Sequence, residues 1–236
     1  MHVNSILRPL IIQNHCEDKP VIWSINVDEL EKSLLSLIAT DCDGKPLDIE
    51  AAFALWVDLT VQIREQKRTI FLIGNGASAS MASHVAADLA KNAHVHTEVF
   101  TDLALITAIA NDLSFQEIFS EPLKRRLVPG DTVVAISSSG QSPNILQAVE
   151  TTKKHGGKVV SLSAMDSENS LRRLGDLNFY IPAQTYSMAE TCHTAILHYW
   201  IDLTIVRSKP DHERNYTVNG KDSRYRQQLF FRGTFR

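Results

Sequence analysis

Two short loops rich in glycine and serine have the composition of phosphate-binding loops. The first reads GNGASAS at residues 74–80, and the second reads SSSGQSPN at residues 137–144. Glycine allows tight turns and close approach of a ligand to the backbone. Serine hydroxyls and the free N–H groups at the start of a following helix attract anions. One such loop is also explained by a turn with helix caps, but two of them favour a phosphate ligand. Neither carries the lysine of a Walker loop.

A second set of residues has the chemistry of proton transfer or metal binding. His84 and Asp88 are four residues apart in a segment with helical periodicity, so they share one face of the helix. Such a pair suits a divalent metal ion, or a base that is oriented by its partner. A later helical segment carries Glu190, His193 and His198. We expect His193 to be a packing residue.

The elements that must position these residues alternate along the chain. Short apolar runs predict strands at 69–74, 131–137, 158–164 and 177–182, and the segment 96–100 is a further candidate strand. Helical periodicity is found at 27–40, 48–66, 79–92, 116–127, 143–155, 167–174 and 188–206. This alternation predicts an α/β fold, a three-layer sandwich with a five-stranded parallel sheet and added N-terminal helices. Both loops follow the carboxyl ends of strands, where open parallel sheets bind ligands.

Composition limits the class of protein. The chain has 236 residues, 44% of them hydrophobic and 22% charged, which is typical of a globular protein and excludes disordered and coiled-coil classes. We find no membrane-spanning stretch and no signal peptide. The net charge of −3 disfavours direct nucleic-acid binding, and three widely spaced cysteines favour a cytoplasmic location. We expect an N-terminal extension at 1–47, a main domain at 48–206 and a basic tail at 207–236.

Several landmarks together resemble one family. They are Asn75-Gly76-x-Ser78, then His84, Ala110-Asn111-Asp112, Ser137-Ser138-Ser139 with Ser142, and the segment 190–198 with its two histidines. This pattern resembles the sugar isomerase (SIS) phosphosugar-binding family over about residues 48–206, and within it the sedoheptulose-7-phosphate isomerases. The resemblance implies a flavodoxin-like strand order and aldose–ketose isomerisation of a sugar phosphate through an enediolate. It also implies a homotetramer or dimer with sites between subunits.

The resemblance assigns roles residue by residue. By the resemblance, five serines contact the phosphate and nearby hydroxyls: Ser78, Ser137, Ser138, Ser139 and Ser142. The other residues expected to bind the substrate are Asn75, Gly76, Asn111, Asp112 and Glu190. A divalent metal, expected to be zinc, is assigned to His84, Asp88, Glu190 and His198, with Asp88 and His198 also catalytic.

Two of these positions depart from the family. Asp88 replaces Glu, which shortens the side chain by ~1.3 Å, and Glu190 replaces Gln. On a regular helix Glu190 and His198 would be ~12 Å apart. Both therefore reach one ion only if Glu190 lies at or before the helix start, or if they serve the sites of different subunits.

Two other functions are compatible with the same fold. A non-catalytic SIS branch binds the bacterial replication initiator protein, and the segment 103–112 fits that branch too. The retention of His84, an acid at 88 and His198 favours the isomerase. A phosphosugar-sensing regulatory domain is disfavoured, because the first 47 residues are too short and too acidic for a DNA-binding partner domain.

Overall fold

The fold is built on one mixed sheet, and the computed structural model describes residues 22–208. The strands are β1 (Ile38–Asp41), β2 (Pro46–Leu47), β3 (Thr69–Gly74), β4 (His96–Val99), β5 (Thr132–Ser137), β6 (Lys158–Ala164) and β7 (Leu177–Ile181). Their order across the sheet is β2-β1-β7-β6-β5-β3-β4. The five strands β3 to β7 are parallel and have the expected flavodoxin-like order.

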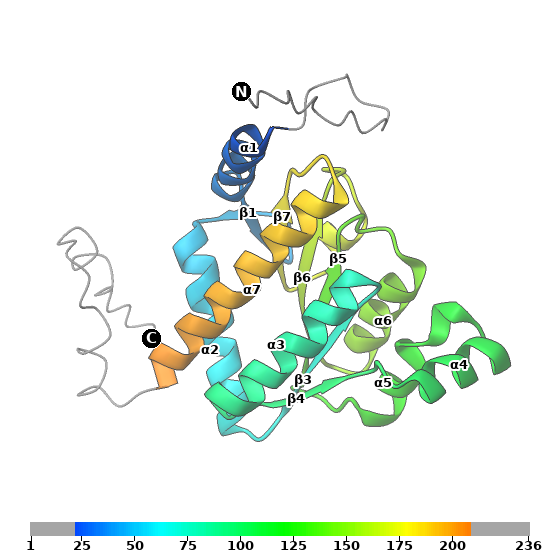
Figure 1. Cartoon of the computed structure of the whole chain (residues 1–236). Helices are drawn as coiled ribbons and strands as arrows, with labels where there is room; N and C mark the ends of the chain where they lie inside the picture. Colours follow the sequence, from blue (N-terminus) through cyan, green and yellow to red (C-terminus); the bar gives the residue numbers. More distant parts are fainter. Residues whose placement is uncertain (1–21, 209–236) are drawn as a thin grey trace, which may run out of the picture.

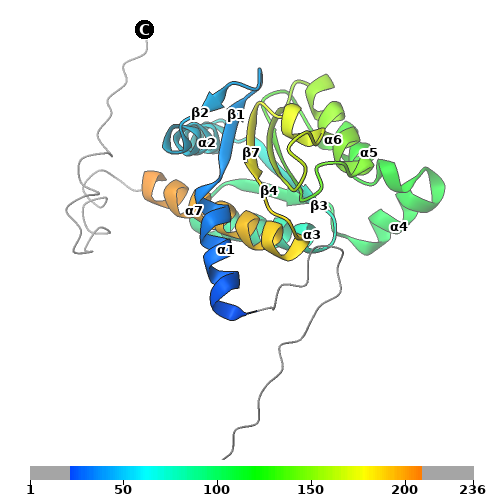
Figure 2. The same ribbon diagram turned by 90° about the horizontal axis from the view of Figure 1, so that it is seen from above.

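Helices cover both faces of the sheet. They are α1 (Trp23–Leu35), α2 (Ile49–Glu65), α3 (Ala77–Ala93), α4 (Leu103–Asp112), α5 (Ser120–Arg126), α6 (Pro143–Lys154) and α7 (Tyr186–Ser208). Alternate side chains of each strand point to opposite faces, so Leu72 packs with α2, α3 and α7 while Ile73 packs with α5 and α6. Figures 1 and 2 show α3 and α7 on one side of the sheet and α6 on the other. The predicted three-layer sandwich is therefore confirmed.

The N-terminal part of the sheet was not expected. The predicted helix at 27–40 is wrong at its end, because α1 stops at Leu35 and β1 follows. β1 pairs antiparallel with β7 and, through a tight turn, with β2. In that turn Asp41 accepts hydrogen bonds from the N–H groups of Asp43 and Lys45, and Gly44 has φ of +76°. The Asp-Gly pair is a hairpin signal, and the pairing with β7 gives the edge of the sheet a partner.

Three helix predictions also need correction. α4 was missed, although Asp102 caps it by accepting a hydrogen bond from the N–H of Leu105 at 2.8 Å. The predicted helix at 116–127 is divided into the short 3-10 turn Phe115–Glu117 and α5. Pro122 explains the division, since proline is tolerated only in the first turn of a helix. The predicted helix at 167–174 is only the 3-10 turn Leu171–Arg173.

An aromatic stack fixes α7 beside α2. Trp56 and Trp200 stack with ring centroids 4.1 Å apart, and Trp200 Nε1 donates to Thr60 Oγ1 at 2.9 Å. α7 in turn packs along α3, which bears one half of the candidate site. In the part of the chain that the structure describes, no helix is long and apolar enough to cross a membrane. Most of the expected basic tail, and the beginning of the expected N-terminal extension, lie outside the described residues.

Candidate active site

The two phosphate-type loops lie side by side at the carboxyl edge of the sheet. β3 pairs with β5, and Gly74 at the end of β3 is opposite Ile136. A side chain at Gly74 would meet the Cβ of Ser78 at 2.6 Å, so only glycine lets α3 begin this close to the strand. Gly76 has φ of +55° and sits at the N-terminal cap of α3. The first loop therefore depends on both glycines.

The serine loop after β5 presents several hydroxyls at the start of α6. Ser137 Oγ and Ser142 Oγ are 3.3 Å apart, and Ser139 Oγ accepts a hydrogen bond from the N–H of Gln141. Ser138 Oγ is buried and has no hydrogen-bond partner among the described residues. Because buried polar groups are nearly always paired, this hydroxyl is a candidate donor to a ligand oxygen.

Two asparagines that the sequence analysis missed support these loops. Asn144, only 1% exposed, exchanges two hydrogen bonds with Asn75 of the first loop. Asn169 is fully buried and lies against Gly140, where an added Cβ atom would overlap its Oδ1. Gly140 has φ of +62° and donates its N–H to the carbonyl oxygen of Ser137. Asn144 is the last residue of the loop 137–144, but the sequence does not indicate which partner its amide would bind.

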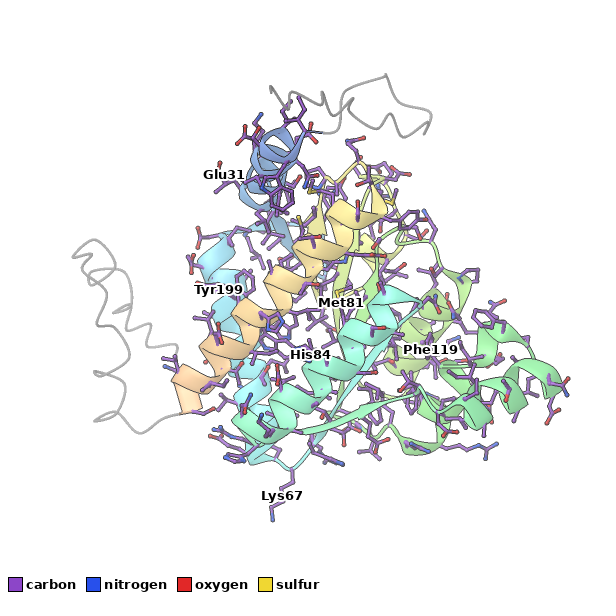
Figure 3. All side chains as sticks on the ribbon, in the orientation of Figure 1. Glu31, Lys67, Met81, His84, Phe119 and Tyr199 are labelled. Atoms are coloured by element: carbon purple, nitrogen blue, oxygen red, sulfur yellow. The ribbon has the colours of Figure 1, made fainter. Side chains whose placement is uncertain are left out.

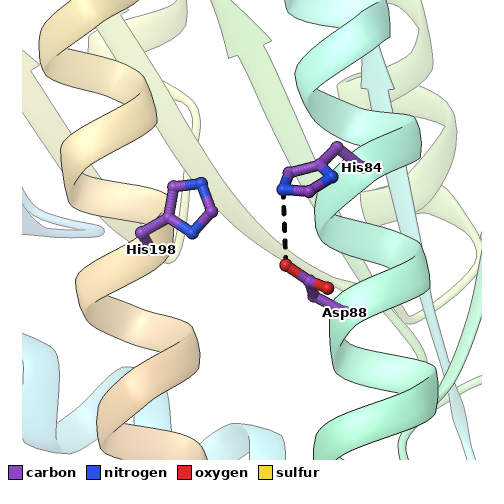
Figure 4. Close-up of side chains that lie close together, drawn as sticks. All are labelled: His84, Asp88 and His198. Carbon is purple, nitrogen blue, oxygen red and sulfur yellow. Dashed lines mark ion pairs between the residues drawn. The ribbon is translucent and has the colours of Figure 1, made fainter.

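The histidine and acid residues meet on the outer side of α3 and α7. His84 Nε2 is 3.4 Å from Asp88 Oδ2, and the rings of His84 and His198 have centroids 5.3 Å apart. Figure 3 shows His84 and Met81 along α3, and Figure 4 shows His198 of α7 facing the pair on α3. The expected one-face arrangement of His84 and Asp88 is therefore present, and α7 adds His198 to it.

The three side chains fit the requirements of a divalent metal. One ligand atom of each lies within 4.8 Å of the others. Two imidazole nitrogens and a carboxylate oxygen are borderline and hard donors, a combination that zinc accepts. A catalytic zinc site typically has three protein ligands and one position left for water or substrate. His84, Asp88 and His198 would supply the three protein ligands.

Glu190 does not join this group within one chain. It lies inside α7, which begins at Tyr186, and His198 follows two turns later. The separation along the axis is therefore ~12 Å. Glu190 could share an ion with His198 of its own chain only from a position at or before the start of the helix. Because α7 begins at Tyr186, Glu190 does not have that position.

The expected sugar-contact residues of the segment 110–112 lie at the end of α4. Asn111 and Asp112 are both exposed, and Asn111 Nδ2 donates to Asp112 Oδ1 at 2.8 Å. Within residues 22–208, no hydrogen bond joins either side chain to the two loops. The contact between these two side chains is therefore with each other, and neither is held by a hydrogen bond from the loops.

His193 and Cys192 are packing residues on the inner side of α7. His193 is fully buried, and burial lowers its pKa to about 4, because the charged imidazolium would lose its hydration. Burial also raises the pKa of the Cys192 thiol, which disfavours the reactive thiolate. The expected packing role of His193 is consistent with this position.

Comparison with known proteins identifies relatives of this chain. Residues 47–164 match the family model of the SIS domain. The chain is 33% identical over 180 residues to a phosphoheptose isomerase of Coxiella burnetii, covering 69% of this chain and 90% of that protein. It is 33% identical over 140 residues to a phosphoheptose isomerase of Trichlorobacter lovleyi, covering 57% of this chain and 71% of that protein. The solved phosphoheptose isomerase of Neisseria gonorrhoeae matches with a TM-score of 0.63 at 26% identity, covering 77% of this chain and 93% of that one.

Proposed function

The chain belongs to the SIS-domain family and is a phosphosugar isomerase, and from this premise we propose that its substrate is sedoheptulose 7-phosphate or a closely related sugar phosphate. The relatives at 33% identity are phosphoheptose isomerases, which supports a seven-carbon substrate. The reaction would move the carbonyl between the first two carbons of the open-chain sugar. A cytoplasmic location is part of the proposal, since a charged phosphate does not cross a bilayer unaided.

The two loops would hold the phosphate end of the substrate. The unpartnered hydroxyl of Ser138 and the neighbouring hydroxyls of Ser137 and Ser142 offer donors to phosphate oxygens. Ser78 at the start of α3 and Ser139 would complete this group. The N-termini of α3 and α6 both lie at this edge, and their dipoles favour the negative charge. Asn75 and Gly76 would contact the sugar chain beside it.

The cluster on α3 and α7 would carry out the proton transfer. Asp88 is the proposed base that removes a proton from the carbon beside the carbonyl. His84, 3.4 Å from Asp88, would hold the carboxylate in place. His198 would return a proton to the neighbouring carbon. The single observation that carries the proposal is the meeting of these three side chains from two helices.

The same three residues would hold a divalent cation, and we propose zinc. When bound there, the ion would polarise the carbonyl oxygen of the sugar and stabilise negative charge on it. Glu190 would be a further ligand or substrate contact for the site of a neighbouring subunit, because its position on α7 separates it from His198 of its own chain.

Assembly of subunits would complete the site, and we propose a homotetramer or a dimer. Asn111 and Asp112 are exposed at the end of α4, as residues that serve a neighbouring copy would be. α1 buries none of its residues within the chain, and Trp23 is 79% exposed. Leu30 and Leu34 pack against the core, whereas Trp23 and Leu35 at the two ends of the helix are exposed, and these uncovered apolar side chains support an interface that includes the N-terminal helices.

An NMR assay in deuterium oxide tests the reaction directly. The purified protein, with its metal content measured, is incubated with sedoheptulose 7-phosphate. An enediolate route predicts an aldose product with deuterium on the carbon that receives the proton. Bound substrate without any conversion or exchange would instead favour the alternative, a non-catalytic SIS protein that binds phosphosugars and acts through a protein partner. Conversion of a six-carbon phosphosugar alone would change the substrate but retain the reaction.

A further inference from the structure

A reciprocal pair of side-chain amides joins the two phosphate-type loops. Asn75 Nδ2 donates to Asn144 Oδ1 at 3.0 Å, and Asn144 Nδ2 donates to Asn75 Oδ1 at 2.8 Å. Asn75 follows β3, whereas Asn144 lies in the first turn of α6 after the serine loop. The two side chains thus connect the first loop to the second.

The orientation of this pair is fixed by the backbone. The N–H of Ile145 is shared between Asn144 Oδ1 and the carbonyl oxygen of Ser142, each at 3.0 Å. An amide has one accepting oxygen and one donating nitrogen, so this hydrogen bond determines which end of Asn144 faces α6. With Asn144 set, a flipped Asn75 would place nitrogen against nitrogen and oxygen against oxygen. Asn75 is therefore held in a single orientation.

Asn144 has no direct access to a ligand. Its side chain is 1% exposed, its oxygen already accepts two hydrogen bonds, and one of its two N–H groups is used by Asn75. Asn75 is only half-buried, and it keeps one N–H donor and one oxygen lone pair outside the pair. Only Asn75 can present these groups to the sugar.

We propose that Asn144 is a positioning residue that fixes the amide of Asn75, so that its remaining donor and acceptor meet the sugar hydroxyls in one defined arrangement. This inference rests on the proposed phosphosugar site. A sugar hydroxyl can donate or accept a hydrogen bond. An amide held in one orientation determines which hydroxyl donates to its oxygen and which accepts from its N–H group. A buried amide left without its partner is costly, which supports a marked effect of losing Asn144.

The test compares single and double variants for both turnover and binding of sedoheptulose 7-phosphate. In Asn144→Asp a second acceptor oxygen faces Asn75 Oδ1, so Asn75 must flip or move. Asn144→Ser is a second variant that removes the amide without adding charge. We expect kcat/KM to fall about 10- to 100-fold in each, and affinity for the sugar phosphate to fall alongside it. The double variant Asn75→Ala/Asn144→Ser should be no worse than Asn75→Ala, because Asn144 acts only through Asn75.

Asn178→Ser is the matched control. Asn178 is also 1% exposed and makes several hydrogen bonds, but it lies at the amino end of β7, at the opposite edge of the sheet. The Asn178→Ser variant should be less stable than the wild type, but its folded form should keep the kinetic constants of the wild type. Additive losses in the double variant, or unchanged kinetics and affinity in both Asn144 variants, would overturn the inference. If the wild-type protein binds the sugar phosphate without converting it, the proposed reaction fails, while weaker binding by the Asn144 variants would still support the positioning role.

Discussion

At the scale of single residues, the site combines a shortened acid with two histidines. Asp88 has one methylene fewer than the glutamate expected at this position, but its Oδ2 still reaches to 3.4 Å from His84 Nε2. The packing of α7 against α3 brings His198 to the same place. The shorter side chain is therefore compatible with a shared ligand cluster.

Replacing Asp88 by asparagine should remove the base and keep the shape. We expect Asp88→Asn to lower kcat by about 100-fold or more, since general-base catalysis contributes factors of about 10² to 10⁴. Steady-state kinetics with sedoheptulose 7-phosphate measures the change. Asp58→Asn, on the exposed side of α2, is the control and should retain full activity. An active Asp88→Asn enzyme would assign the base to another group.

The buried imidazole of His193 should make the stability of the fold depend on pH. Its pKa of about 4 in the folded chain is below the ordinary value of 6.5, so the unfolded chain binds the proton more readily between these pH values. Above pH 6.5 the imidazole is neutral in both states and its titration does not affect the free energy of unfolding. As the pH falls toward 4, proton uptake by the unfolded chain lowers the free energy of unfolding, on the order of 3 kcal/mol in total. Urea unfolding of His193→Leu should show a flatter loss over this range than the wild type. Equal slopes would contradict the assignment.

At the scale of elements, the sequence predicted the parts of the fold that have strong periodicity. Four of the five parallel strands, β3, β5, β6 and β7, are mainly apolar runs, and the loops after β3 and β5 were recognised from glycine and serine alone. The β1–β2 hairpin was missed because its strands are short and lie beside a helical pattern that runs into them. α4 was missed because its first eight residues, LALITAIA, are apolar almost throughout, so no polar face marks a helical period.

The candidate site was predictable to a similar extent. The spacing of His84 and Asp88 placed them together, because one helix carries both. The distance from His198 depends on how α7 packs against α3, which no local pattern encodes; here the family resemblance was needed. Asn144 and Asn169 were missed because the partner of a buried amide is determined by tertiary structure.

The first loop gives a prediction about backbone conformation. Gly76→Ala and Gly44→Ala both place a side chain at positive φ, with no atom within 4 Å of the new Cβ. Each should cost about 1 kcal/mol or more in stability, because L residues are strained there. Only Gly76→Ala should also raise KM, since Gly44 lies in the β1–β2 turn. Thermal unfolding and steady-state kinetics measure the two effects, and equal KM values would argue against a ligand role for the first loop.

At the scale of the whole molecule, the proposed assembly would complete the site with residues of a second subunit. The loops and the cluster on α3 and α7 come from one chain, in which Glu190 lies two helical turns from His198 and Asn111 is exposed at the end of α4. α1 projects beside α7 with no buried residue of its own (Figure 1). An assembly that covers α1 would explain both features.

Substitutions on α1 should therefore weaken the assembly. Trp23 and Leu35 are 79% and 81% exposed at the two ends of the helix. We expect Trp23→Ser/Leu35→Ser to shift the mass measured by light scattering toward the monomer and to lower activity with it. Val128→Ser, also an exposed apolar residue but in the loop before β5, should leave the mass unchanged. A double variant with the wild-type mass would exclude α1 from the interface.

The most direct test of the account separates binding from chemistry in one variant, His198→Ala. The account assigns the phosphate to the loops at the sheet edge and the proton transfer to the cluster on α3 and α7. Calorimetry and NMR turnover with sedoheptulose 7-phosphate should show substrate affinity within a few-fold of the wild type and turnover reduced at least about 100-fold. Turnover at the wild-type rate in His198→Ala would contradict the account, because the cluster would then have no part in the reaction.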